Sequence, residues 1–286
     1  MATRLSAGGP LVPAPDEVDW SAPWLQPLRV QALPLVQALR QGDPVWQALD
    51  AAAGAAAAPV RFVPQQALPP GQAYEAYIRA HAAVPTREGW HDFLNGLIWL
   101  HFPATKRQLN ALQSQVIAAQ GVGTLRGALR DACTLFDENA ALLQGPDALW
   151  ETLCRRDWPC LFGELRPLWR EVRVTLFGHA LIEKLLQPRK DITAHVLRVP
   201  EELQPAQLDS WLADALSAET LATKPFQPLP LLGIPGWWAA NEDPVFYADP
   251  GVFRGPRSVG TPLIPDDSPL TFPPAVPNPA LAQRRS

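Results

Sequence analysis

The sequence has few charges, and their balance is slightly acidic. Charged residues make up 18% of the 286 residues, and the formal net charge is −4. The lysines Lys106, Lys184, Lys190 and Lys224 stand far apart, and no basic stripe runs along any segment. Proteins that bind nucleic acid gather lysine and arginine against the phosphates. We therefore expect no nucleic-acid partner.

Cysteine is also scarce. The three cysteines Cys133, Cys154 and Cys160 form an odd set without paired spacing, which argues against a disulfide framework. No run approaches the roughly 18 apolar residues of a membrane-spanning helix, and the first residues contain no apolar segment of signal-peptide length. These absences favour a cytoplasmic protein with reduced thiols and no membrane partner.

Short motifs of high specificity are missing as well. The chain contains no GxGxxG, GxxxxGK[ST], HExxH, GxSxG or CxxC pattern. Dinucleotide binding, phosphate-loop chemistry and the well-marked zinc and serine hydrolases therefore receive no support from local spacing. Any functional site has to be assembled from residues that lie far apart in the sequence.

Proline, by contrast, is abundant, with 33 residues. Residues 10–34 hold six of them and residues 225–279 hold fourteen, so neither end can form long helices or central strands. The second region also carries many aromatic residues, which is unusual for a disordered linker. We predict four parts: a flexible leader at 1–19, a main globular domain at 20–224, a tail packed on that domain at 225–258, and a disordered tail at 259–286.

The pattern between the proline-rich ends is mostly helical. Apolar residues at three-to-four spacing predict helices at 71–83, 89–102, 104–118, 146–169, 179–186 and 201–217, after a broken helical pattern over 20–68. Residues 171–177 and 192–199 have strand patterns on either side of the helix at 179–186. The expected fold is therefore α+β and mainly helical, with a small sheet.

A hairpin is a further candidate for that sheet. Cys133–Phe136 and Ala140–Leu143 have strand propensity, and Asp137-Glu138-Asn139 between them has turn chemistry. The alternative makes Asp137 or Asn139 the N-cap of a helix that starts at Ala140. We favour the hairpin.

Four segments together resemble a known family. They read WHDFLNGLIWLHFPATKRQLNAL, RDACTLFDENAALL, FGHALIEKLLQPRKDITAH and LPLLGIPGWWAANEDPVFYADPGVFRGPR, and they cover most of residues 85–257. In this order they resemble the bacterial domain-of-unknown-function family 3025. The resemblance implies an uncharacterised bacterial protein and brings no activity, substrate or catalytic residue with it. The chain departs from the family pattern at Asn139-Ala140, where Asn-Gly is usual, and at Gln113, where histidine is usual.

Two pairs of polar residues have the spacing of one helix face. His91 and Asn95 are four apart in an otherwise apolar helix, and His179 and Glu183 are four apart in another. An imidazole and a carboxylate at that spacing can bind one metal ion or form a general base with its orienting partner. The alternative is that both pairs are hydrogen-bonded core or intrahelical pairs without chemistry.

Carboxylates and cations elsewhere complete the candidate site. Asp137 and Glu138 offer oxygen ligands, or an acid and a base, although the same residues suit a solvated turn. Lys184, Lys190 and Arg254 could hold an anionic group of a substrate, although the arginine also suits a packed tail whose cations pair with acids of the domain.

The enzyme hypothesis assigns these residues to roles in a hydrolase-like site. A divalent metal would be bound by His91, His179 and Glu183, and the catalytic residues would be Asp137, Glu138 and His179. Asn95, Lys184, Lys190 and Arg254 would bind the substrate. The alternative is a non-catalytic binding protein with a small-molecule or protein partner, whose polar residues form core hydrogen-bond networks. The first hypothesis requires these side chains to converge, and the second does not.

Overall fold

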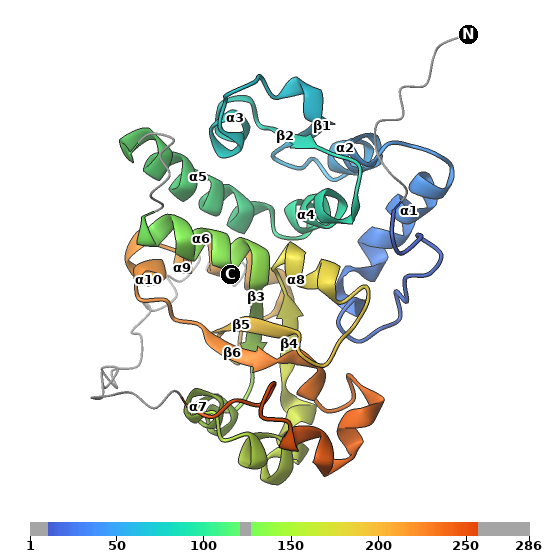
Figure 1. Ribbon diagram of the computed structural model, residues 1–286. Coiled ribbons are helices and arrows are strands. Elements are labelled where there is room, and N and C mark those ends of the chain that lie inside the picture. The colour runs from blue at the N-terminus through green and yellow to red at the C-terminus, as the bar shows by residue number, and fades with distance from the viewer. Residues whose placement is uncertain (1–10, 121–126, 257–286) are drawn as a thin grey trace, which may run out of the picture. The chain divides into compact units, whose positions relative to one another are not determined.

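The computed structural model describes residues 11–120 and 127–256, and their fold is α+β and mainly helical, as predicted (Figure 1). A mixed sheet of four strands has the order β4-β3-β5-β6. Its strands are β3 (Ala140–Gln144), β4 (Arg173–Leu176), β5 (Thr193–Arg198) and β6 (Gln227–Pro230). β3 pairs antiparallel with β4 and parallel with β5, while β6 runs antiparallel to β5 at the edge. Every residue of β3 is buried, as expected for an inner strand covered on both faces.

Helices α4 (Trp90–His101), α5 (Pro103–Gln120), α6 (Ala128–Asn139) and α8 (His179–Lys184) gather beside this sheet (Figure 1). α4 is apolar nearly all round and is buried along most of its length, as its sequence predicted. α4 contacts α5 and α8. α6 also contacts α5 and α8. These contacts bring residues from three distant segments of the chain together at one place.

The amino-terminal part forms a smaller layer. Helices α1 (Arg29–Arg40) and α2 (Val45–Ala55) precede a parallel pair of strands, β1 (Arg61–Pro64) and β2 (Ala83–Thr86), with α3 (Tyr74–His81) between them. The strand pair was not predicted, because each strand has only four residues and includes a proline. The short turns of 3-10 type in this part are Gln26–Leu28 and Gln65–Ala67.

The predicted hairpin at residues 133–143 is wrong, and so is its alternative. Residues 128–139 form α6, which runs into β3 at Ala140 without an intervening turn. Ala132, Cys133 and Phe136 lie on the buried side of α6 at helical spacing. Burial of this face, rather than the strand propensity of four residues, decides the structure.

Two predicted helices are shorter than expected, for reasons visible in the sequence. The helix predicted at 146–169 is α7 (Asp147–Arg155), a π turn at Cys160–Glu164 and a 3-10 turn at Arg166–Glu171. The helix predicted at 201–217 is a 3-10 turn at Pro205–Gln207 followed by α9 (Leu208–Ala215). Prolines divide both segments, since they remove a backbone donor from a helix interior. A further short helix, α10 (Ala218–Ala222), follows.

The strand–helix–strand unit β4-α8-β5 was predicted, whereas β6 was not recognised within the proline-rich tail. After β6 the chain forms 3-10 turns at Leu231–Gly233, Ala239–Glu242 and Pro244–Ala248. Phe226 before β6, and Phe246 and Phe253 after it, are buried in the core. The predicted disordered tail at 259–286 lies outside the described residues.

The predicted leader at 1–19 is described only from residue 11 onward. Within that part, Val18 is buried and the carbonyl of Pro13 accepts a hydrogen bond of 2.7 Å from the indole Nε1 of Trp90. Among the described residues, no helix is both long and apolar enough to cross a membrane.

Candidate functional site

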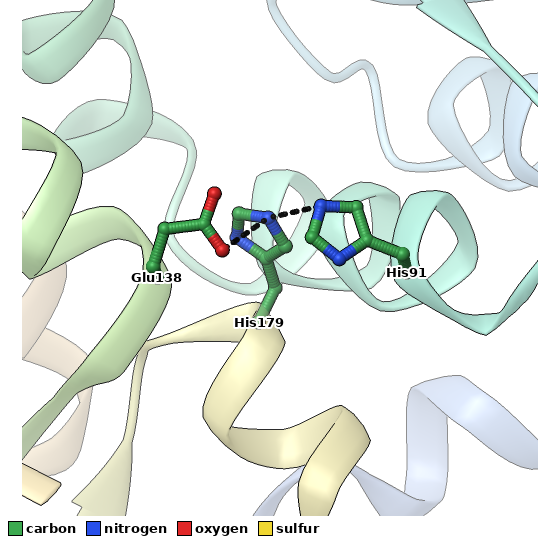
Figure 2. Close-up of side chains that lie close together, drawn as sticks. All are labelled: His91, Glu138 and His179. Atoms are coloured by element: carbon green, nitrogen blue, oxygen red, sulfur yellow. Dashed lines mark hydrogen bonds and ion pairs between the residues drawn. The ribbon is translucent and has the colours of Figure 1, made fainter.

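Two histidines from different helices face each other at the contact between α4 and α8. The Nε2 atoms of His91 and His179 lie 3.1 Å apart, and the ring centroids are 4.6 Å apart at an interplanar angle of 72°. Figure 2 shows that the two rings point toward one another. At such a distance the two nitrogens either share a proton or direct lone pairs at a common cation, because two free lone pairs would repel.

A carboxylate from α6 approaches the same point. Glu138 lies in the last turn of α6, and its Oε2 is 3.6 Å from Nε2 of His179. In Figure 2 the interactions from His91 and Glu138 both end on this one nitrogen. Each of the three residues offers a ligand atom within 4.8 Å of the others. The structure therefore brings His91, Glu138 and His179 together, from three different helices.

The carboxylate of Glu183 lies behind His91 rather than between the histidines. Its Oε2 is 2.9 Å from Nδ1 of His91, and this hydrogen bond raises the pKa of His91 above its ordinary value. A carboxylate at Nδ1 favours a proton on that nitrogen, which leaves Nε2 of the neutral ring as an acceptor. His91 and Glu183 are both about 40% exposed, with side-chain values of 39% and 41%, so this side of the site faces solvent.

His179 is buried, and burial lowers its pKa to about 4. The ring is therefore neutral at pH 7. Its Nδ1 has no hydrogen-bond partner among the described residues, and the nearest carboxylate oxygen, Oδ2 of Asp137, is 3.9 Å away. Gly178 allows this placement, because a Cβ at Gly178 would meet the backbone nitrogen of Asn139 at 2.5 Å.

Asp137 forms an ion pair with a buried lysine. Its Oδ1 is 2.5 Å from Nζ of Lys106, which also donates to Oδ1 of Asn95 at 2.8 Å. Burial alone would raise the pKa of Asp137, but the charge and the hydrogen bond of Lys106 outweigh it and the pKa is lowered. Asn95 donates in turn to the hydroxyl of Tyr74 at 3.2 Å. Asn95 thus belongs to this buried chain and does not contact His91 by a hydrogen bond.

Sequence reasoning missed the role of Lys106. A signal was present, because Lys106, Asn110 and Gln113 follow one another at helical spacing on α5 and are all buried. A polar stripe on the inner face of a helix requires partners of its own.

Glu138 titrates differently from Asp137. Burial and the neighbouring charge of Asp137 raise the pKa of Glu138 above its ordinary value.

The predicted substrate-binding cations fall into two groups. Nζ of Lys184 donates to Oδ1 of Asn139 at 2.9 Å, one residue beyond Glu138. Lys190 instead pairs with Asp249 at 3.1 Å and lies over the ring of Phe246. Nε of Arg254 donates to the carbonyl of Gly251. The structure therefore brings Lys184 next to the site, whereas the contacts of Lys190 and Arg254 lie in the carboxy-terminal segment.

The ligand spacing can be compared with that of a bound ion. A tetrahedral zinc ion with nitrogen and oxygen ligands at about 2.0–2.1 Å has ligand–ligand distances of about 3.3 Å. The measured distances of 3.1 Å between the histidine nitrogens and 3.6 Å between His179 and Glu138 lie on either side of that value. The third pair, His91 and Glu138, offers ligand atoms within 4.8 Å of each other.

These features define an α+β protein with a histidine–glutamate cluster at the meeting point of three helices. The model of the family described as protein of unknown function DUF3025 matches residues 60–257, a span that includes every residue of the cluster. The chain belongs to this family. No curated protein and no solved structure matches the chain.

Proposed function

We propose that the protein is a metal-dependent hydrolase whose divalent ion is bound by His91, Glu138 and His179. The observation that carries the proposal is the approach of two Nε2 atoms to 3.1 Å with a carboxylate oxygen 3.6 Å from one of them. The sequence hypothesis placed Glu183 among the ligands. We now assign Glu183 to orienting His91, because it contacts the nitrogen on the far side of that ring.

The neutral state of buried His179 suits a metal ligand. Metal ligands must be deprotonated to bind, and burial keeps His179 neutral far below pH 7. A carboxylate on the second nitrogen of a ligating histidine is the usual outer-shell partner in metal sites, where it fixes the ring and raises its basicity. Glu183 stands in that relation to His91.

The open side of the cluster leaves room for a reactant. His179 is buried, whereas the side chain of Glu138 is 31% exposed and that of His91 is 39% exposed. Catalytic zinc sites have three protein ligands and keep a further position for water or substrate. A bound divalent ion would supply Lewis acidity and lower the pKa of a bound water molecule.

Three further roles fall to side chains at the site. Glu138 has a second carboxylate oxygen that can accept the proton of an attacking water. Asp137, tied to Lys106, holds a negative charge 3.9 Å from Nδ1 of His179 and stabilises that ring in place. Lys184 is exposed, hydrogen-bonded to Asn139, and offers a positive charge to an anionic group of the substrate. Esters with a phosphate or carboxylate group fit this charge.

The test is hydrolysis of p-nitrophenyl phosphate, with the neutral ester p-nitrophenyl acetate for comparison, by metal-free protein with Zn²⁺, Mn²⁺ or Mg²⁺ added back. We expect activity with at least one ion and a loss of about 100-fold or more in His179→Ala. His101→Ala is the matched control, because His101 ends the same helix as His91 but pairs with Gln31. Hydrolysis that is independent of added metal, or unchanged in His179→Ala, would refute the proposal.

A non-catalytic binding protein remains the second candidate, and one observation favours it. Lys106, Asn95, Tyr74 and Asp137 satisfy one another inside the core, as a purely stabilising network would. That candidate predicts no hydrolysis under any of these conditions.

For either candidate we propose the cytoplasm as the compartment, since Cys133, Cys154 and Cys160 are all free.

A further inference from the structure

A second site is indicated by a cavity that does not include the histidine cluster. The cavity has a volume of about 530 Å³ and lies between the π turn Cys160–Glu164 and the 3-10 turns Ala239–Glu242 and Pro244–Ala248. Pockets that bind small molecules usually measure about 300–1,000 Å³. The volume therefore suits a small organic ligand rather than a single ion.

The apolar side of this cavity is formed by aromatic rings that are already fixed. Phe162 and Tyr247 stack with centroids 4.9 Å apart at an angle of 17°, and Trp158 stacks on Phe162 at 12°. The indole Nε1 of Trp158 donates to the carbonyl of Arg254, and the hydroxyl of Tyr247 donates to the carbonyl of Gly233. A ligand would meet a pre-organised wall, which reduces the entropy lost on binding.

The polar side of the cavity carries a cation held by mostly neutral partners. Arg166 donates to the hydroxyl of Tyr247 at 3.0 Å, to Oδ1 of Asn241 at 3.4 Å and to Oε1 of Glu242 at 2.7 Å. Asn241 is itself buried, and its Nδ2 donates to the carbonyls of Leu232 and Ile234. The guanidinium is therefore anchored by two neutral groups, Tyr247 and Asn241, and is paired with one acid, Glu242.

The acid that pairs with Arg166 is exposed to solvent. The side chain of Glu242 is 67% exposed, whereas that of Arg166 is 28% exposed. Ion pairs with a solvent-facing partner contribute little to stability, so an anion entering the cavity can replace the exposed Glu242 at small cost. A guanidinium has five N–H donors in a planar fork and suits carboxylate, sulfonate or phosphate groups.

We propose that this cavity binds a small planar aromatic anion, with its ring on the wall of Trp158, Phe162 and Tyr247 and its acidic group on Arg166. The proposal is independent of the metal site, because the two sites share no residue. The aromatic lining contributes apolar contact, and Arg166 selects for negative charge. A neutral compound of the same shape would bind more weakly.

The first test compares two fluorescent probes on the full-length protein. 8-Anilinonaphthalene-1-sulfonate is an aromatic anion with a planar naphthalene unit, and N-phenyl-1-naphthylamine has the same ring skeleton without the sulfonate. We expect saturable binding of the sulfonate at one site, about tenfold tighter than binding of the neutral probe. Equal affinities for the two probes, or binding of the sulfonate that does not saturate, would overturn the proposal.

A cavity-filling variant locates the binding. Gly163 lines the cavity, and a Cβ built there meets no atom within 4 Å, so Gly163→Phe adds a ring without a backbone clash. We expect about tenfold weaker binding of the sulfonate. Gly54→Phe is the matched control, because Gly54 on α2 is exposed and equally free of neighbours. Unchanged affinity in Gly163→Phe would show that the probe binds elsewhere.

Two charge variants keep the proposal testable if Gly163→Phe does not fold. Arg166→Gln should abolish the preference for the sulfonate over the neutral probe. Glu242→Gln should raise affinity for the sulfonate, because it removes the competing carboxylate. Partial unfolding does not produce such a selective gain at one saturable site. A preference that survives in Arg166→Gln, or sulfonate affinity that falls in Glu242→Gln, would contradict the proposal.

Discussion

Nε2 of His91 lies 3.1 Å from Nε2 of His179, although the two residues are 88 positions apart in the sequence. Each histidine belongs to a different helix, and the Nδ1 atoms of the two rings have different surroundings. Nδ1 of His91 contacts Glu183, whereas Nδ1 of His179 is buried near Asp137. The pair therefore has one solvent-facing and one buried member, an arrangement that suits an ion held at the protein surface.

Replacing Glu183 with glutamine should weaken metal binding without removing a ligand. The carboxylate orients His91 and increases its basicity, and loss of such an outer-shell partner costs about 10–100-fold in metal affinity. Competition with a chromophoric chelator measures the affinity. Glu151→Gln is the control, because Glu151 is an exposed acid paired with Arg155 on α7. Equal affinity in native and Glu183→Gln protein would remove Glu183 from the site.

Gly178→Ala should disrupt the junction between α8 and the end of α6. The added Cβ would meet backbone atoms of Glu138, Asn139 and Ala140 at 2.5–2.6 Å, which no side-chain rotation can relieve. We expect a loss of about 1–3 kcal/mol in the free energy of unfolding and weaker metal binding, since His179 and Glu138 must move apart. Chemical denaturation measures the first effect. Gly163→Ala, where the Cβ is free of neighbours, should change neither property.

Lys106→Met should be strongly destabilising. The substitution leaves Asp137 buried without its cation, and breaking a buried ion pair on one side costs about 3–5 kcal/mol. The double variant Lys106→Met with Asp137→Asn should recover much of that loss, because it removes the unpaired charge. Urea unfolding provides the comparison, with the exposed Lys184→Met as control. A double variant no more stable than Lys106→Met would contradict the importance of this pair.

The metal-free protein should lose stability as the pH falls from about 6.5 toward 4. Burial lowers the pKa of His179 to about 4, below its ordinary value of 6.5. Between these values the unfolded imidazole binds more protons than the folded one, so the stability from neutral His179 is complete above pH 6.5 and declines below it. This lowering of the pKa of His179 corresponds to a total loss of about 3 kcal/mol in the free energy of unfolding.

His91 changes the stability in the opposite direction, because its hydrogen bond to Glu183 raises its pKa. Its contribution to the free energy of unfolding is present at low pH and is lost as the pH rises through the pKa of the folded state. The effect of His179 is therefore isolated by a variant. Urea unfolding at pH 7 and pH 5, in chelator, should show a smaller decline for His179→Leu than for the native protein. The exposed His81→Leu should behave as native. Parallel declines in native and His179→Leu protein would contradict the neutral state of His179.

Much of the framework around the site could be predicted from local patterns. The apolar helix with His91 and the unit β4-α8-β5 with His179 follow from hydrophobic periodicity and proline positions. The four-residue spacing of His179 and Glu183 also placed them on one helix, although Glu183 reaches toward His91 rather than toward a shared ion.

Other parts depend on tertiary contacts that no local pattern reveals. The segment of Glu138 reads as a turn, yet burial of Phe136 and its neighbours extends α6 through it. β6 contains Pro228 and Pro230, and it is tolerated in the sheet because it lies at the edge. Lys106 lies 31 positions before Asp137, and the packing of α5 against α6 brings the two side chains together.

The most direct measurement is elemental analysis of protein purified without an affinity tag. We predict about one divalent ion per chain in native protein and in His101→Ala, and less than about a tenth of that amount in His179→Ala. A native protein without a bound ion, even after incubation with Zn²⁺ and gel filtration, would contradict the metal site. In that case His91 and His179 would belong to the hydrogen-bonded core, and His179→Ala would differ from native protein only in stability.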